Sequence, residues 1–148
     1  MHGMSDTEYL LALEEIKLLK ARRDRAVDTK DWALYRSLHA DHHVSHNDGY
    51  ERWESADVMI ANVSKLLDET KTSVHHSHTP DITFQSATTA KSIWGMEDLI
   101  FDTASGELLI HGFGFYHEGY EKIDGKWLFN SRQLKRTLVR EKPESRQA

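Results

Sequence analysis

Three histidines occupy four consecutive positions within the segment SVHHSHTPDITFQS, residues 73–86. Alternate residues of a strand point to opposite faces, so an extended conformation places His75 on one face and both His76 and His78 on the other. Histidine is the side chain whose charge changes near neutral pH. This segment is therefore the first candidate for acid–base chemistry in the chain.

A second group of histidines, in the segment HADHHVSH at residues 39–46, raises the question of a metal site. Zinc needs three or four ligands that converge tetrahedrally, and the seven histidines of the two segments could supply them. No helical H-x-x-x-H or H-E-x-x-H pattern is present, so we expect polar strand and loop histidines and no metal. His46 is a candidate for the mouth of a pocket. His78 is another, provided that a bulge before Pro80 turns its side chain.

Arginines and aromatic residues supply the other candidates. Strand alternation puts Arg136 on one face with Arg132 and Leu134. A pocket arginine can bind a carboxylate, an enolate oxygen or a phenolate, although a solvated basic strand end explains Arg136 equally well. The aromatic candidates for the wall of a pocket are Trp94 and two tyrosines that could donate to an oxyanion, Tyr50 and Tyr116.

Composition limits the class of protein. The chain has 148 residues, a net charge of −5 and no cysteine, so it suits one domain without disulfides or thiolate metal sites. It lacks the basic face of a nucleic-acid-binding protein and the long apolar run of a membrane span. The start of the chain lacks the layout of a secretory signal, so we expect a cytoplasmic protein. We expect a single domain over residues 7–140, with flexible termini at 1–6 and 141–148.

Hydrophobic spacing predicts three helices followed by a run of strands. The helices are predicted over residues 7–27, 30–38 and 56–68, with a short strand and an Asn-Asp-Gly turn within 39–52, and long strands over 72–86, 88–102, 108–123 and 126–139. Glycines at 112, 114 and 119 indicate a sheet that bends sharply. The predicted fold is α+β: a cone-shaped barrel with three N-terminal helices packed on a strongly bent, mostly antiparallel sheet. The mouth of such a cone suits a small molecule.

The sequence resembles the SnoaL-like branch of the nuclear transport factor 2-like superfamily, in particular bile-acid 7α-dehydratase and, more distantly, scytalone dehydratase. The resemblance covers about residues 14–140. Four stretches carry it: RAVDTKDW at 25–32, SVHHSHTPDI at 73–82, TTAKSIWGMEDLI at 88–100 and FYHEGYEKIDGKW at 115–127.

The resemblance implies roles for individual residues. In that family an aspartate at the end of the first helix supports a strand histidine, the base of a cofactor-free elimination, and the matching positions are Asp28 and His75. Such a carboxylate fixes the imidazole tautomer and stabilises the imidazolium that proton abstraction produces. A family arginine matches Arg136. A tyrosine of the bile-acid enzyme falls on Arg23, which either pairs with Asp28 or stabilises charge, because arginine does not readily give up a proton.

Two functions follow as alternatives. The first is a lyase of dehydratase type, or an isomerase, that acts without a cofactor on a hydrophobic cyclic ketone or enone, with His75 as the base. The second is a protein of the same fold that binds a small hydrophobic molecule, or serves as an accessory subunit, without catalysis. No glycine-rich nucleotide loop or nucleophile elbow is present. A metal-dependent enzyme is a third alternative, and the resemblance implies a homodimer or homotrimer.

Overall fold

The computed structural model describes residues 2–143 of the chain. The elements are α1 (Asp6–Asp28), α2 (Trp32–Ser37), β1 (His39–Ser45), α3 (Ala56–Leu66), β2 (Lys71–Phe84), β3 (Thr89–Asp102), β4 (Leu108–Ile123) and β5 (Lys126–Glu141). The predicted order and type of these elements are confirmed, with shifts of a few residues at their ends. The predicted flexible tail lies largely outside the described residues, which end at 143.

Helix α1 begins at a capping box and contributes buried apolar side chains to the core. The Ser5 hydroxyl accepts from the backbone N–H of Glu8, and the Glu8 carboxylate accepts from the backbone N–H of Ser5. Ile16 and Leu19 then bury the apolar face of the helix. One turn further the same face stays buried although it becomes charged, because Lys20 and Arg23 are 1% and 2% exposed. The buried face of α1 therefore changes from apolar to charged side chains toward the C-terminal end of the helix.

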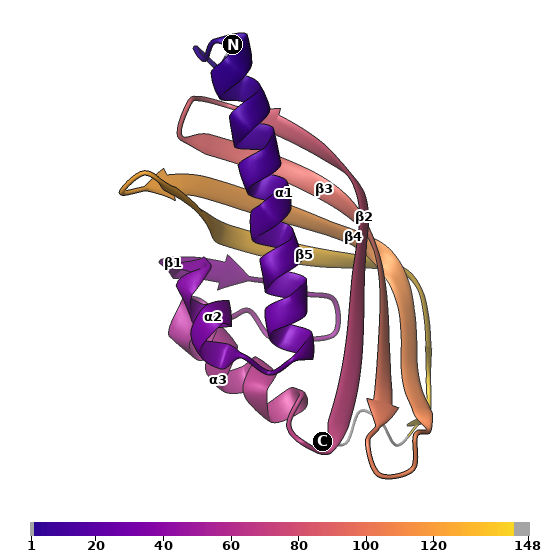
Figure 1. Ribbon diagram of the computed structural model, residues 1–148. Coiled ribbons are helices and arrows are strands. Elements are labelled where there is room, and N and C mark those ends of the chain that lie inside the picture. The colour runs from indigo at the N-terminus through magenta and orange to yellow at the C-terminus, as the bar shows by residue number, and fades with distance from the viewer. Residues whose placement is uncertain (1, 144–148) are drawn as a thin grey trace.

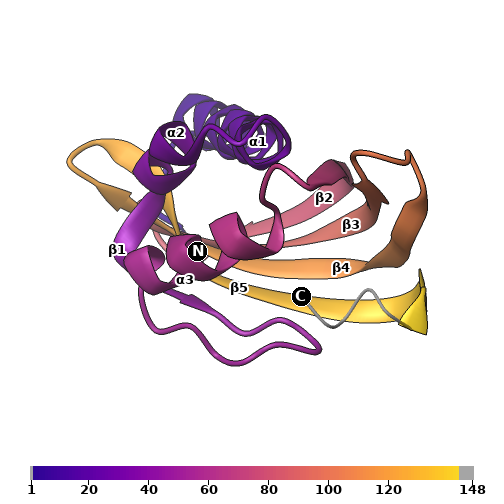
Figure 2. The same cartoon turned by 90° about the horizontal axis from the view of Figure 1, so that it is seen from below.

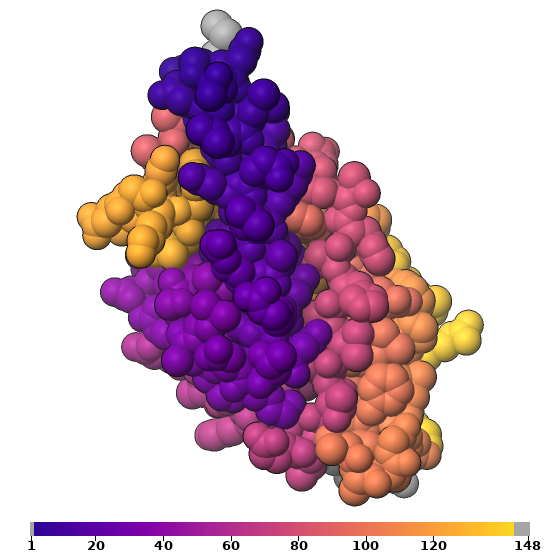
Figure 3. All heavy atoms as spheres, viewed as in Figure 1, coloured from indigo at the N-terminus to yellow at the C-terminus, as the bar shows by residue number. Residues whose placement is uncertain are grey.

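The five strands form one mixed sheet in the order β1-β5-β4-β3-β2. Strand β1 runs parallel to β5, and the other neighbours are antiparallel. Figures 1 and 2 show the helices gathered on one side of this sheet. Figure 3 shows α1 running along the surface of the molecule. No helix within residues 2–143 is long and apolar enough to cross a membrane.

The predicted α+β class is confirmed, but the predicted cone-shaped barrel with a strongly bent sheet is wrong, because the sheet is neither closed nor strongly curled. Strands β1 and β2 are its two edges, and α1 rather than another strand lies beside β2. The glycines that suggested sharp bending have local uses instead. The pairing of β4 with β5 shifts register beside Gly114 and Gly119, as expected of β-bulges.

Candidate active site

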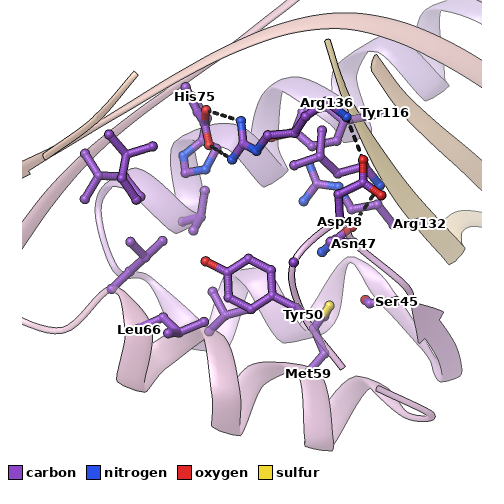
Figure 4. Close-up of a pocket in the computed structure, with 18 of the residues that line it drawn as sticks. Ser45, Asn47, Asp48, Tyr50, Met59, Leu66, His75, Tyr116, Arg132 and Arg136 are labelled. Carbon is purple, nitrogen blue, oxygen red and sulfur yellow. Dashed lines mark hydrogen bonds and ion pairs between the residues drawn. The ribbon is translucent and has the colours of Figure 1, made fainter. Parts of the chain in front are cut away.

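A cavity of about 540 Å³ lies between the helices and the inner face of the sheet. Its apolar side comes from α3 and the facing strands, with Met59, Leu66 and Ile100 among its residues. Its polar side carries charged side chains from β2, β3 and β5. Figure 4 shows His75 and Arg136 on that side, with Tyr50 projecting from the β1–α3 loop.

His75 and Asp28 meet at the edge of this cavity. The His75 Nδ1 is 2.6 Å from Asp28 Oδ1, and the backbone N–H of His75 donates to Asp28 Oδ2 at 2.7 Å. The Ser73 hydroxyl donates to the same carboxylate at 2.9 Å. An ionised carboxylate can only accept, so Nδ1 carries the proton and the lone pair of a neutral ring lies on Nε2. Because His75 lines the cavity, it can act there as a base.

The alternation of β2 and the turn of α1 produce this contact. Ser73, His75 and Ser77 share one face of the strand, as the sequence predicts, and in the structure that face turns toward α1. Asp24 and Asp28 lie one helical turn apart and therefore share a face of α1. The Ser77 hydroxyl donates to Asp24 Oδ2 at 2.6 Å, so two aspartates fasten the helix to the edge strand. The base is thus held by its own strand and by the end of α1.

A partly buried ion pair lies next to His75. Asp98 on β3 is paired in register with His75, and its carboxylate accepts from both terminal nitrogens of Arg136 at 2.8 and 2.9 Å. Burial alone would raise the pKa of the Asp98 carboxyl, but the hydrogen bonds and charge of Arg136 hold that pKa below its ordinary value. Asp98 therefore stays ionised, and Arg136 is largely neutralised.

Arg23 takes neutral partners. Its Nε donates to His39 Nε2 at 3.1 Å, and its Nη2 donates to the Tyr35 hydroxyl at 2.7 Å. The alternative of a salt bridge with Asp28 is wrong, since that carboxylate faces His75 and Ser73. Arg23 lines the cavity as a buried cation, and its role in stabilising charge there stays a prediction.

Arg132 is the second buried cation of the cavity wall. Its guanidinium lies 3.5 Å from the ring centroid of Tyr116 and is 8% exposed as a residue. Within residues 2–143 its Nε and Nη2 have no hydrogen-bond partner. Burial, followed by the charges of Arg23 and Arg132, lowers the pKa of His43 to about 3. This wall of the cavity therefore favours negative charge.

A family model described as a SnoaL-like domain matches residues 8–133. The chain belongs to the SnoaL-like domain family. This family lies within the nuclear transport factor 2-like superfamily, so the resemblance seen in the sequence is confirmed.

Solved structures similar to this SnoaL-like chain include two enzymes of one kind. A type 2 hexachlorocyclohexane dehydrochlorinase (LinA) is 18% identical, with a TM-score of 0.83 and 93% of each chain covered. LinA type 3 from Novosphingobium barchaimii is 18% identical, with a TM-score of 0.81, covering 94% of this chain and 95% of that one. A candidate scytalone dehydratase from Novosphingobium aromaticivorans is 17% identical, with a TM-score of 0.85, covering 93% and 92%. At these identities the likeness shows a shared fold.

Five of the residues singled out in this SnoaL-like sequence line the cavity: His75, Arg136, Arg23, Tyr50 and Tyr116. Asp28 lies directly behind His75. Burial raises the pKa of the Tyr116 phenol, so this group is a neutral donor. These residues come from α1, the β1–α3 loop and three strands, and the fold brings them to one place.

Three other candidates lie away from the cavity. Pairing of β2 with β3 does shift register between Ser77 and Pro80, yet His78 remains exposed and does not line the cavity. His46 lies in a separate depression that does not include His75. Trp94 packs in the core, where its indole N–H donates to the Tyr120 hydroxyl at 3.0 Å. Within residues 2–143 no group of three or more histidine, aspartate or glutamate side chains is arranged to hold a metal ion.

Sequence reasoning assigned no role to Asp98, Tyr35 or Ser73, and named Arg132 only as a neighbour of Arg136. A signal for Asp98 was present, because it continues the inward alternation of two buried residues, Trp94 and Met96. A charged residue on the buried face of a strand needs an oppositely charged or hydrogen-bonding partner. Identifying that partner requires knowing which strands are neighbours.

Gly112 of β4 gives the Asp98–Arg136 pair its room. A Cβ at this position would overlap Arg136 Nη1 and Asp98 Oδ1. We expect Gly112→Ala to displace the pair and lower the free energy of unfolding by about 1–3 kcal/mol. Gly95→Ala is the matched control, since its Cβ would meet only His78 Cβ at 3.7 Å. Urea unfolding of both variants checks this, and equal midpoints would contradict it.

Proposed function

We propose that this protein is a cofactor-independent lyase that eliminates a small leaving group from a hydrophobic cyclic ketone or enone. The contact of His75 with Asp28 at the cavity carries the proposal, because it supplies a base of fixed tautomer. The names of similar structures, a dehydrochlorinase and a candidate scytalone dehydratase, support an elimination. Both reactions remove a proton and a leaving group from neighbouring carbons.

In the proposed reaction, His75 Nε2 takes the proton from the carbon next to the carbonyl. The electron pair of that C–H bond moves toward the carbonyl oxygen and forms an enolate, while Asp28 stabilises the imidazolium. The enolate then expels the leaving group from the β carbon with its bonding electrons, and a carbon–carbon double bond forms. The imidazolium gives its proton to the departing group, which leaves as water or hydrogen chloride and restores neutral His75. Positioned proton transfer of this kind typically accelerates a reaction by about 10²–10⁴-fold.

The cationic wall is suited to the negative charge that develops. Arg132 has buried N–H groups without a partner in the described residues, and the neutral Tyr116 phenol lies beside it. Preorganised donors of this kind stabilise an enolate oxygen or a departing anion. Arg136 fits the assigned role less well, since both of its terminal nitrogens already bond to Asp98. In the proposed reaction it keeps Asp98 ionised beside His75.

The size and chemistry of the cavity support a hydrophobic substrate. Its volume of about 540 Å³ falls within the range of ordinary small-molecule sites. The side formed by α3 offers apolar side chains without charge, including Met59, Val63 and Leu66. The ring system of the substrate would lie against this side, and the carbon next to its carbonyl would lie beside His75.

Incubation with a panel of cyclic 3-hydroxy ketones and their 3-chloro analogues, followed by mass spectrometry, tests the proposal. We expect enzyme-dependent loss of water or of hydrogen chloride from at least one hydrophobic member. The second candidate function is a binding protein, favoured by Arg23 at the position of the family tyrosine. A panel member that binds and is recovered unchanged after long incubation would support that alternative.

A further inference from the structure

Lys20 is a buried cation that does not line the cavity. It is 1% exposed on α1, and its Nζ contacts the carboxylate of Glu118 on β4, whose side chain is 0% exposed. The same nitrogen lies 4.0 Å from Asp24 Oδ1 and 4.1 Å from the ring centroid of Tyr116. Charged side chains are almost never fully buried unless they are paired. The proposed reaction gives this ammonium no task.

Arg132 lies close to the same two carboxylates without pairing with them. It stands opposite Glu118 in the β4–β5 register, yet within residues 2–143 no ion pair joins Arg132 to Glu118 or Asp24. Glu118 Oε2, Asp24 Oδ1 and two nitrogens of Arg132 are buried without a hydrogen-bond partner in that range. Lys20 is the cation that these carboxylates contact.

We propose that Lys20 is a positioning residue that holds Glu118 and Asp24, so that the Arg132 guanidinium stays available to negative charge in the cavity. This inference rests on the proposed function. The three buried cations Lys20, Arg23 and Arg132 act on the buried Glu118 and the half-buried Asp24, which leaves one positive charge in surplus among these five groups. Loss of the Lys20 charge would remove the surplus and would leave the buried Glu118 without the cation that contacts it. The nearest cation able to compensate it is Arg132.

The titration of Lys20 supports the same conclusion. Burial lowers its pKa to about 8, although Glu118 and Asp24 oppose that shift. The charged and titratable groups that face it are Arg23 and Asp24 on α1, Tyr116 and Glu118 on β4, and Arg132 on β5. Asp24 has a lowered pKa, whereas the pKa values of Tyr116 and Arg132 are raised. Raising the pH through about 8 therefore discharges Lys20 while those three groups keep their charge states.

Binding of 2,4-dinitrophenolate, an enolate-like anion that stays ionised across this pH range, tests the inference by titration calorimetry. We expect Lys20→Met to weaken its binding by about tenfold or more. The double variant Lys20→Met/Glu118→Gln removes both partners and should restore the affinity to within about threefold of wild type. Neutral 1,3-dinitrobenzene is the control probe, and it should bind equally to all three proteins.

The pH dependence gives a second measurement that needs no substitution. Wild type should lose affinity for the anion as the pH rises through the Lys20 pKa of about 8, and the double variant should not. Unchanged anion affinity in Lys20→Met overturns the inference, and if that variant does not fold, unchanged wild-type affinity above this pKa overturns it. Failure of the wild-type protein to bind the anion at neutral pH would instead refute the charge role of Arg132 in the proposed function.

Discussion

Replacing His75 with asparagine is expected to lower the turnover of the proposed elimination by about 10²–10⁴-fold. Asparagine keeps an N–H that can donate to Asp28, so the helix-to-strand contact survives. It has no nitrogen that can take a proton at neutral pH, and the reaction loses its base. Steady-state kinetics on the most reactive panel substrate measure the effect, with the free energy of unfolding as the check on folding.

His76→Asn is the matched control for this prediction. His76 is the adjacent histidine, it is exposed, and it points to the opposite face of β2. Its replacement should leave kcat and KM unchanged. Wild-type activity in both variants would remove His75 from the mechanism, and equal losses in both would point to damage of the strand.

Replacing Arg132 with methionine should lower kcat by about 10²–10³-fold, with a small change in KM. Methionine fills much of the same space against Tyr116 but offers no N–H and no charge. The loss should fall on kcat because the guanidinium meets charge that develops only along the reaction. Kinetics with the same substrate separate the two parameters.

Arg140→Met provides the comparison for Arg132→Met. Arg140 lies on the same strand but is exposed and does not line the cavity. It should retain wild-type kinetics. A rise in KM with unchanged kcat in Arg132→Met would contradict this role of Arg132. It would show that Arg132 stabilises the bound substrate and the transition state equally.

Local patterns in the sequence were sufficient for the elements of this fold. Spacing of three and four identified the helices, and alternation identified the long strands. Alternation also placed Ser73, His75 and Ser77 on one face, and all three side chains turn toward α1. The partner of His75 came from the family resemblance, because no local pattern links residues 28 and 75. Their side chains lie 2.6 Å apart.

Local sequence patterns do not predict which strands, or which side chains far apart in the sequence, become neighbours. Whether a sheet closes depends on which strands form its edges, and α1 lies beside β2 where closure required another strand. The direction of the His78 side chain depends on the register shift before Pro80. Strand alternation does not predict how such a shift turns a side chain. The Asp98–Arg136 pair joins β3 to β5 across Gly112 of β4. The sequence alone therefore does not indicate that these two residues are partners.

Exchange of a carbon-bound proton tests directly whether His75 takes a proton from carbon within this cavity. Wild type and His75→Asn are incubated in deuterium oxide with a cyclic ketone that has no leaving group, and deuterium next to the carbonyl is measured by NMR. We expect enzyme-dependent exchange in wild type and none above background in His75→Asn. Equal exchange in both proteins, or exchange in neither, would contradict it.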